Sequence, residues 1–199
     1  KVVAITDFIV EYPLTPASID ESKVDYVVKI DSIGNPKLIV SGTTVITRDP
    51  VGLTMARYAS QVVEFSGLLK DGFSLQTGAG GASLASTQFL KAIMKEKGIQ
   101  GSFGMGGITG YFVDLLKEGL FKTLLDVQCF DQIAVQSLKD NPNHREISAS
   151  AYASPGSRGS AVDKLDVVML GATQIDTEFN RSEERRGGKQ CIYRWSPVD

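Results

Sequence analysis

Hydrophobic and polar positions alternate along the chain as the strands and helices of an α/β protein require. β-branched runs at 2–5 and 24–30 predict two strands, each followed by turn-forming or extended residues. Asp49 and Pro50 predict a helix start, because Asp can accept from first-turn amides and Pro lacks the N–H that has no partner there. Helical spacing predicts that this helix ends before Gly72, through Met55, Ala59, Val62, Ser66 and Leu69.

Strands and helices then alternate to residue 170. Strands are predicted at 73–76, at a segment ending near 103, at 124–129 and at 167–170, and helices at 83–97, at 109–118 and after Asp131. Gly98 is expected to close the second helix in a left-handed conformation. This alternation predicts an open, mainly parallel sheet with helices on both faces.

The composition argues against several classes of protein: nucleic-acid-binding, membrane-spanning, zinc-cluster and disulfide-rich proteins. The chain has a net charge of -2, so it lacks the basic balance typical of nucleic-acid-binding domains. No apolar run reaches membrane-spanning length, and no leader precedes the first strand. One histidine and two cysteines are too few for a typical zinc cluster or disulfide framework. We therefore expect a cytoplasmic protein that binds no metal, nucleic acid or membrane.

The segment GFSLQTGAGGASLA is the most informative for chemistry. A strand runs into a loop with Gly78, Gly80 and Gly81, and a helix begins near Ser83. At the carboxyl end of a parallel strand, glycines expose backbone N–H groups and the helix N-terminus favours negative charge. The loop could hold a phosphate, a carboxylate or the oxyanion of a thioester. The alternative is a tight turn that needs glycine only for its backbone angles.

A second glycine cluster spans 104–110 and is expected in the next strand-to-helix loop. Gly104, Gly106 and Gly107 could form another wall of the same ligand site. The alternative is close packing of a helix on the sheet.

His144 follows a helix stop in NPNHRE, so we expect it in a polar loop. A lone loop histidine is more often a structural hydrogen-bonder than a catalytic base. Cys129, inside an apolar strand, is expected to be a small buried hydrophobe.

The final segment, 181–199, differs in composition from the rest and reads RSEERRGGKQCIYRWSPVD. It could be a basic arm for a partner or a solvated extension. It also resembles the in-frame translation of a sequencing-library adapter. We therefore expect a non-native or disordered tail and a natural chain that continues differently after Asn180.

Six stretches within 2–180 resemble the α subunit of citrate lyase, the citrate CoA-transferase subunit. They read VVAITDFIVEYPLTPASI, VDYVVKID, DGFSLQTGAGGASLA, GGITGYFVDLLKEGL, NPNHREISASAYA and LDVVMLGAT. The resemblance implies that acetyl is exchanged for citryl on the CoA-like (phosphoribosyl-dephospho-CoA) thioester of an acyl carrier subunit. It implies β and γ (acyl carrier) subunits as partners in a bacterial, multimeric complex, with acetate released and no cofactor bound covalently to this chain.

The wider superfamily of acetyl-CoA hydrolases and transferases has two similar domains with a CoA-transferase-like fold. By this resemblance 1–33 is the end of the first domain, 34–48 a linker and 49–180 the front of the second, truncated domain. Cut at both ends, the chain is expected to be inactive alone.

The resemblance also implies site roles. Gly78, Gly80 and Gly81 would lie against the acyl thioester, with Ser83 standing where relatives have proline. Many relatives attack the thioester with a glutamate, and Gly106 falls at that position, so citrate's own carboxylate would attack within a ternary complex.

Substrate binding is expected from the residues around that position and from one polar segment. The candidates are Ser83, Gly104, Gly106, Gly107, His144 and Arg145. Open alternatives are a citramalate CoA-transferase, an acyl-CoA hydrolase or transferase relative, and a non-catalytic α/β assembly module.

Overall fold

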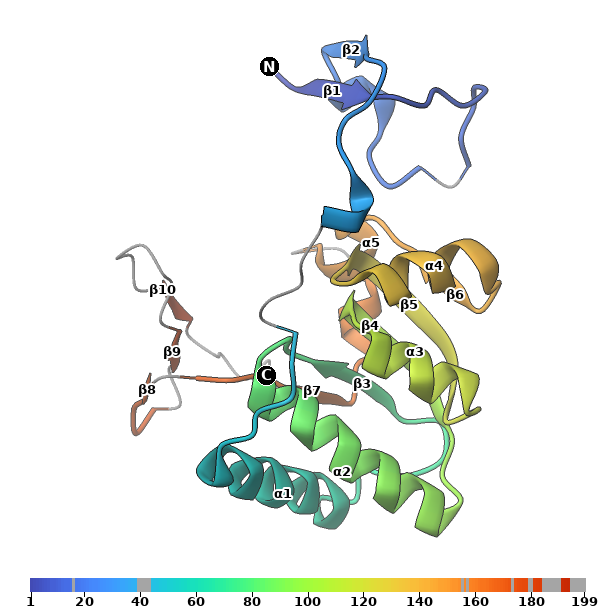
Figure 1. Cartoon of the computed structure of the whole chain (residues 1–199). Helices are drawn as coiled ribbons and strands as arrows, with labels where there is room; N and C mark the ends of the chain where they lie inside the picture. Colours follow the sequence, from blue (N-terminus) through green and yellow to red (C-terminus); the bar gives the residue numbers. More distant parts are fainter. Residues whose placement is uncertain are drawn as a thin grey trace.

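The central feature of the chain is a five-stranded sheet in the order β6-β5-β4-β3-β7, with every neighbouring pair parallel (Figure 1). A computed structural model describes residues 1–15, 17–38, 44–154, 156, 158–172 and 174–178, and the backbone of 181–183 and 191–193. The strands are β3 (Ser74–Thr77), β4 (Gly101–Ile108), β5 (Phe121–Cys129), β6 (His144–Glu146) and β7 (Val167–Met169). The predicted parallel α/β sheet is confirmed.

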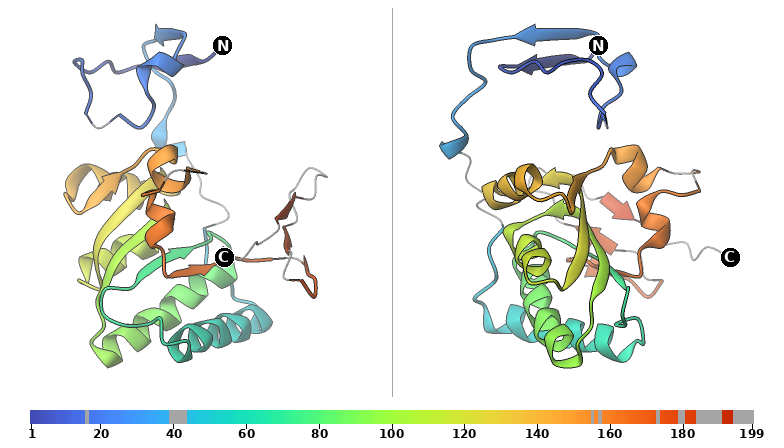
Figure 2. Two further views of the ribbon diagram at one scale, coloured as in Figure 1. Left: turned by 180° about the vertical axis from the view of Figure 1, so that it is seen from behind. Right: turned by 90° about the vertical axis from the view of Figure 1, so that its right-hand side faces the viewer.

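Helices cover both faces of this sheet, as predicted. The connections β3 to β4 to β5 to β6 all step in one direction, and right-handed crossovers place their helices on one face. These helices are α2 (Gly81–Lys97), α3 (Gly110–Lys117) and α4 (Gln132–Asp140). The return from β6 to β7 carries α5 (Ala149–Ala153) and the 3-10 helix η3 (Ala161–Lys164) over the other face (Figure 2).

Helix α1 (Pro50–Phe65) packs against α2 through small residues. Its predicted start is confirmed, since the Asp49 carboxylate accepts from Gly52 N at 2.7 Å. The apolar stripe that predicted the helix is not its buried face, because Met55 and Val62 are 56% and 68% exposed. Short side chains allow the two helices to approach closely, and the buried positions are Gly52, Ala56, Ser60 and Val63.

The segments at either end form separate small sheets. Strands β1 (Val3–Thr6) and β2 (Tyr26–Lys29) pair in parallel, and most of their side chains are exposed. The 3-10 helices η1 (Glu21–Lys23) and η2 (Pro36–Leu38) flank β2, and Gln132 of α4 donates a hydrogen bond to the Pro36 carbonyl.

Beyond β7, three short strands form an antiparallel sheet, β8 (Gln174–Ile175), β9 (Arg181–Glu183) and β10 (Cys191–Tyr193). The last two strands lie within the expected tail, whose other residues lie outside the described part of the chain.

Most of the second glycine cluster lies inside strand β4, so the prediction of a loop there was wrong, and of its glycines only Gly110 lies beyond the strand, at the start of α3. Strand β4 continues to Ile108 with an irregular register between Gly106 and Gly107. A Cβ built at Gly104 would lie 2.5 Å from Cε1 of Phe112, and one at Gly107 would overlap the ring of Phe130. Glycine is needed in β4 because aromatic rings lie directly against its backbone, which is the packing alternative considered above.

The prediction that His144 lies in a polar loop was also wrong. His144 begins β6, and its side chain is buried, with 3% exposed. Its Nδ1 lies 3.0 Å from the Ser137 hydroxyl, and its Nε2 lies 3.0 Å from Oδ2 of the buried Asp126. The half-buried Cys129 donates its thiol to the same oxygen at 2.9 Å. Burial raises the pKa of the Cys129 thiol to about 12, and the bond to Asp126 adds to that rise.

Gly104→Ala should lower the free energy of unfolding by about 1–3 kcal/mol, because the added methyl group must displace Phe112. Urea unfolding followed by circular dichroism measures the change. Gly171→Ala is the matched control, since a Cβ there meets no atom within 4 Å, and it should stay within about 0.5 kcal/mol of the parent. Equal midpoints for both variants would contradict the packing role.

Cys129 should resist thiol reagents at pH 8. A raised pKa lowers the thiolate fraction, and the thiolate is the nucleophile. Against an ordinary thiol with a pKa of about 8.5, labelling by iodoacetamide should be at least about a hundredfold slower. Peptide mass spectrometry separates Cys129 from Cys191, and unfolding in guanidinium should restore the ordinary rate. Rapid labelling of the folded chain would contradict the raised pKa of the Cys129 thiol.

Candidate functional site

A pocket of about 700 Å³ opens at the carboxyl ends of β3, β4 and β7, and we call it the glycine-loop pocket. Strand order reverses between β3 and β7, and open parallel sheets bind ligands at such a point. The loop between β3 and α2 forms one wall and α5 contributes to another. The lining residues are Gln76, Thr77, Gly78, Ala79, Gly80, Ser83, Gly107, Val127, Phe130, Tyr152, Leu170, Gly171 and Ala172.

The N-terminus of α2 supplies the pocket with backbone donors. Gly80 is the N-cap in an extended conformation, with φ -72° and ψ 152°, and no side chain caps the first turn. First-turn N–H groups have no partner within their helix, and a 17-residue helix carries about half a positive charge at this end. This end of α2 can therefore hold an oxyanion.

The glycines of this loop differ in what surrounds them. A Cβ at Gly80 would meet no atom within 4 Å, so packing does not require glycine there. At Gly81 the same atom would lie 2.9 Å from the backbone N of Thr47, whose N–H donates to the Gly81 carbonyl. Gly81 is thus needed for the segment before α1 to approach α2, whereas Gly80 lines the pocket and has open space at its Cβ position.

The structure brings together some of the predicted site residues. Gly78, Gly80, Ser83 and Gly107 line the pocket, and Gly81 adjoins them. Gly104 and Gly106 are buried within β4 and do not line it.

His144 and Arg145, both in β6, do not line the glycine-loop pocket. Both ring nitrogens of His144 are hydrogen-bonded within the protein. Arg145 is exposed and donates from Nε to the Pro142 carbonyl at 3.2 Å.

Gln76 and Tyr152 are pocket residues that the sequence reasoning missed. They come from β3 and α5, and Nε2 of Gln76 donates to the Tyr152 hydroxyl at 2.7 Å. Gln76 could have been predicted as a pocket residue, because it is a polar residue at the end of an apolar strand, just before a glycine loop. No local pattern predicts Tyr152 as a pocket residue, because only the return of the chain over the sheet brings it there.

The described lining of the pocket carries hydroxyl, amide and backbone groups, with no Lys, Arg, His, Asp or Glu among them. Such a lining suits an uncharged polar group, such as a carbonyl, better than a multiply charged anion. Within the described residues, no cluster of three or more His, Cys, Asp or Glu side chains could hold a metal ion. None of the described helices is long and apolar enough to cross a membrane.

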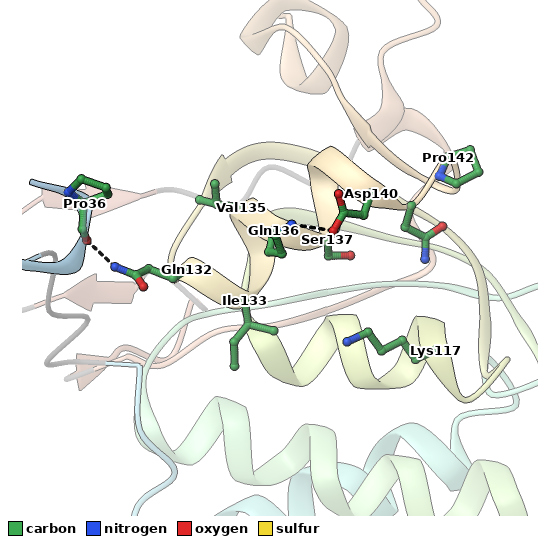
Figure 3. A pocket seen from close by; sticks show the side chains of 10 residues that line it. Pro36, Lys117, Gln132, Ile133, Val135, Gln136, Ser137, Asp140 and Pro142 are labelled. Carbon is green, nitrogen blue, oxygen red and sulfur yellow. Dashed lines mark hydrogen bonds between the residues drawn. The ribbon is translucent and has the colours of Figure 1, made fainter. Parts of the chain in front are cut away.

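A second pocket, of about 760 Å³, lies over α4 and the end of α3 (Figure 3). Ile133, Val135 and the side chain of Lys117 form part of its wall, and Pro36 lies at one end. Although slightly larger, it lies on the outer surface of a helix and gathers no strand ends. We therefore take the glycine-loop pocket as the candidate site.

Comparison with known proteins identifies the family. The model of the citrate lyase alpha subunit family matches residues 1–185. The chain is 54% identical over 179 residues to the citrate lyase alpha chain of Klebsiella pneumoniae, covering 90% of this chain and 35% of that one. It is 51% identical over 180 residues to the Escherichia coli K12 alpha chain, with the same coverage of each.

A solved structure agrees in both sequence and fold. It is described as the alfa subunit of citrate lyase in complex with citrate, from Streptococcus mutans, and is 47% identical with a TM-score of 0.80. The match covers 91% of this chain and 36% of that one. This chain thus spans about 35% of the length of the curated relatives that it matches. By sequence and by fold, the chain belongs to the citrate lyase alpha subunit family.

Proposed function

We propose that this chain is part of a citrate CoA-transferase, which exchanges acetyl for citryl on a thioester. Family membership and the citrate complex of the Streptococcus mutans relative support this reaction class. The donor would be the acetyl thioester on the CoA-like (phosphoribosyl-dephospho-CoA) arm of an acyl carrier γ subunit. A β subunit would cleave the citryl thioester, within a multimeric complex in the bacterial cytoplasm.

The exchange consists of two acyl transfers, and its atoms and charges balance without any further reagent. A citrate carboxylate oxygen attacks the acetyl carbonyl carbon, the C–S bond breaks, and a mixed anhydride and a thiolate form. The thiolate then attacks the citryl carbonyl carbon of the anhydride and expels acetate. Each attack places negative charge on a carbonyl oxygen, so the protein's main task is to stabilise that oxyanion.

The position of Gly80 is the observation that carries the proposal. Its backbone begins α2 at the pocket, and no atom would contact a Cβ there, so a ligand oxygen can approach the first-turn amides. We assign the thioester oxyanion to the amides at the start of α2, beside Ser83. Gly78 lines the pocket, but its own N–H donates to the Met169 carbonyl at 2.8 Å.

The absence of a carboxylate side chain at Gly106 supports direct attack of citrate on the acetyl thioester. Gly106 is buried with φ +105°, a conformation that side chains rarely adopt, and a Cβ there would lie 3.3 Å from Gln76 Cγ. A glutamate nucleophile at this position would be strained and would displace Gln76. In this proposal Gly107 contributes to citrate binding from the pocket wall, whereas Gly104 and Gly106 act indirectly, by giving room to Phe112 and Gln76.

The cationic partners of citrate are proposed to come from elsewhere in the complete subunit. The described pocket lining has no cation, and both nitrogens of His144 already have partners inside the protein. Of the two candidates named above, Arg145 has the exposed side chain, and we keep it as the candidate partner of a citrate carboxylate.

Gly80→Val should reduce transfer by about 10²–10³-fold, because the side chain would cover the amides that hold the oxyanion. The assay uses a complete alpha chain carrying this segment, with acetyl-CoA as donor and citrate, citramalate or water as acceptor. The best acceptor separates a citrate transferase from a citramalate transferase and a hydrolase, and residues 1–199 alone should be inactive.

Ala92→Val is the matched control for Gly80→Val, since it adds the same branched side chain at an exposed position of α2 away from the pocket. Its transfer rate should equal that of the parent. If Gly80→Val also transferred at the parental rate, the oxyanion role of the loop would be rejected.

Initial rates should show sequential kinetics, with double-reciprocal lines that intersect as acetyl-CoA and citrate are varied. No labelled acetyl group should remain on the protein after incubation with acetyl-CoA alone. Parallel lines together with an isolated acetyl-enzyme would instead show a covalent intermediate and overturn direct attack.

A further inference from the structure

We propose that the Tyr152 hydroxyl donates a hydrogen bond to the acyl carbonyl oxygen in the glycine-loop pocket, and that Gln76 positions it. Tyr152 would then be a second oxyanion donor, facing the α2 amides. This inference rests on the proposed function, because it assigns a contact to the acyl group of that reaction.

The two side chains meet at the pocket from adjacent layers, the sheet and the helix that covers one of its faces. Gln76 is on β3, next to the glycine loop, and Tyr152 is on α5, which lies on the other face of the sheet. Both line the pocket, and both are half-buried. The hydroxyl therefore lies where a bound molecule can reach it.

Among the described residues, the Tyr152 hydroxyl accepts a hydrogen bond but donates none, so its proton can be donated to a ligand. The hydroxyl oxygen accepts from Gln76 Nε2 at 2.7 Å, and no described residue accepts the phenolic proton. A phenol has one proton to donate, so it can be given to a ligand oxygen. The bond from Gln76 polarises the hydroxyl and limits its position, which strengthens the donation.

Gly106 explains how Gln76 reaches this position. A Cβ at Gly106 would lie 3.3 Å from both Cγ and Cδ of Gln76 and 3.4 Å from its Nε2. The side chain of Gln76 therefore passes close over the bare backbone of β4. The conformation of Gly106, with φ +105°, is one that side chains rarely adopt, so backbone and packing both favour glycine here.

The character of the pocket favours an uncharged ligand oxygen as the acceptor. Its described lining has neither cations nor carboxylates, so it suits a thioester carbonyl better than citrate. A neutral donor beside backbone amides can stabilise the charge that appears on this oxygen only during reaction, and tyrosine is among the side chains used in this way.

The test compares Tyr152→Phe, Gln76→Leu and the double variant in a complete alpha chain carrying this segment. Tyr152→Phe should lower kcat for transfer from acetyl-CoA by about 10- to 100-fold and leave the KM for citrate unchanged. Gln76→Leu should cost less, and the double variant no more than Tyr152→Phe, because Gln76 acts through the hydroxyl. Tyr58→Phe is the matched control, since that tyrosine is 57% exposed on α1, and it should behave as the parent.

Either of two results would overturn the proposal: an unchanged kcat in Tyr152→Phe, or a loss confined to the KM for citrate. Additive losses in the double variant would remove Gln76 from the positioning role. Unfolding midpoints equal to that of the parent show that the variants fold.

A binding measurement tests the contact even if transfer to citrate is absent. Calorimetry with acetonyl-CoA, a stable analogue that keeps the carbonyl, should show at least about threefold weaker binding by Tyr152→Phe and no change in Tyr58→Phe. Absence of transfer by the parent would reject the proposed function alone, and equal affinities would reject the Tyr152 contact alone.

Discussion

The structure depends on the bare backbone of β4, the middle strand of the five-stranded sheet. Aromatic rings lie where side chains of this strand would otherwise stand, at Gly101, Gly104 and Gly107. Because interiors are packed to near-crystalline density, a ring in that position leaves no room for even a methyl group. The rings of Phe112, Phe121 and Phe130 thereby set how closely α3, β5 and the segment after β5 approach β4.

The same constraint reaches the functional site. Gly106 allows the Gln76 side chain to lie close to the backbone of β4, and Gln76 in turn donates to the Tyr152 hydroxyl of α5 at 2.7 Å. The glycine loop before α2 works differently, because Gly80 has open space at its Cβ position while Gly81 lies against the backbone of Thr47. Neighbouring glycines thus have different surroundings, which are open space, a backbone segment or a side chain, and only the tertiary structure distinguishes them.

Buried polar groups complete the edge of the sheet. Asp126, His144 and Ser137 join β5, β6 and α4 through hydrogen bonds of 3.0 Å, and Cys129 adds its thiol to the same carboxylate. Buried polar groups must find partners inside the protein, so this chain of bonds ties the short edge strand to the layer of helices. His144, the only histidine of the sequence, therefore has a structural role, because both of its ring nitrogens take part in these bonds.

Local signals in the sequence were enough for most helices and strands and for several of their ends, but not for β6 or for the continuation of β4 through its glycines. Asp49, Asp131 and Gly98 mark helix termini through their own backbone and side-chain chemistry, and alternation of strands and helices implies a parallel sheet. The glycine loop could be placed at a strand end for the same reason. What only the tertiary structure decided is which groups meet: the burial of His144, the rings over β4 and the Gln76–Tyr152 pair all join residues distant in sequence. Periodicity describes one segment at a time, whereas a pocket forms from the ends of several.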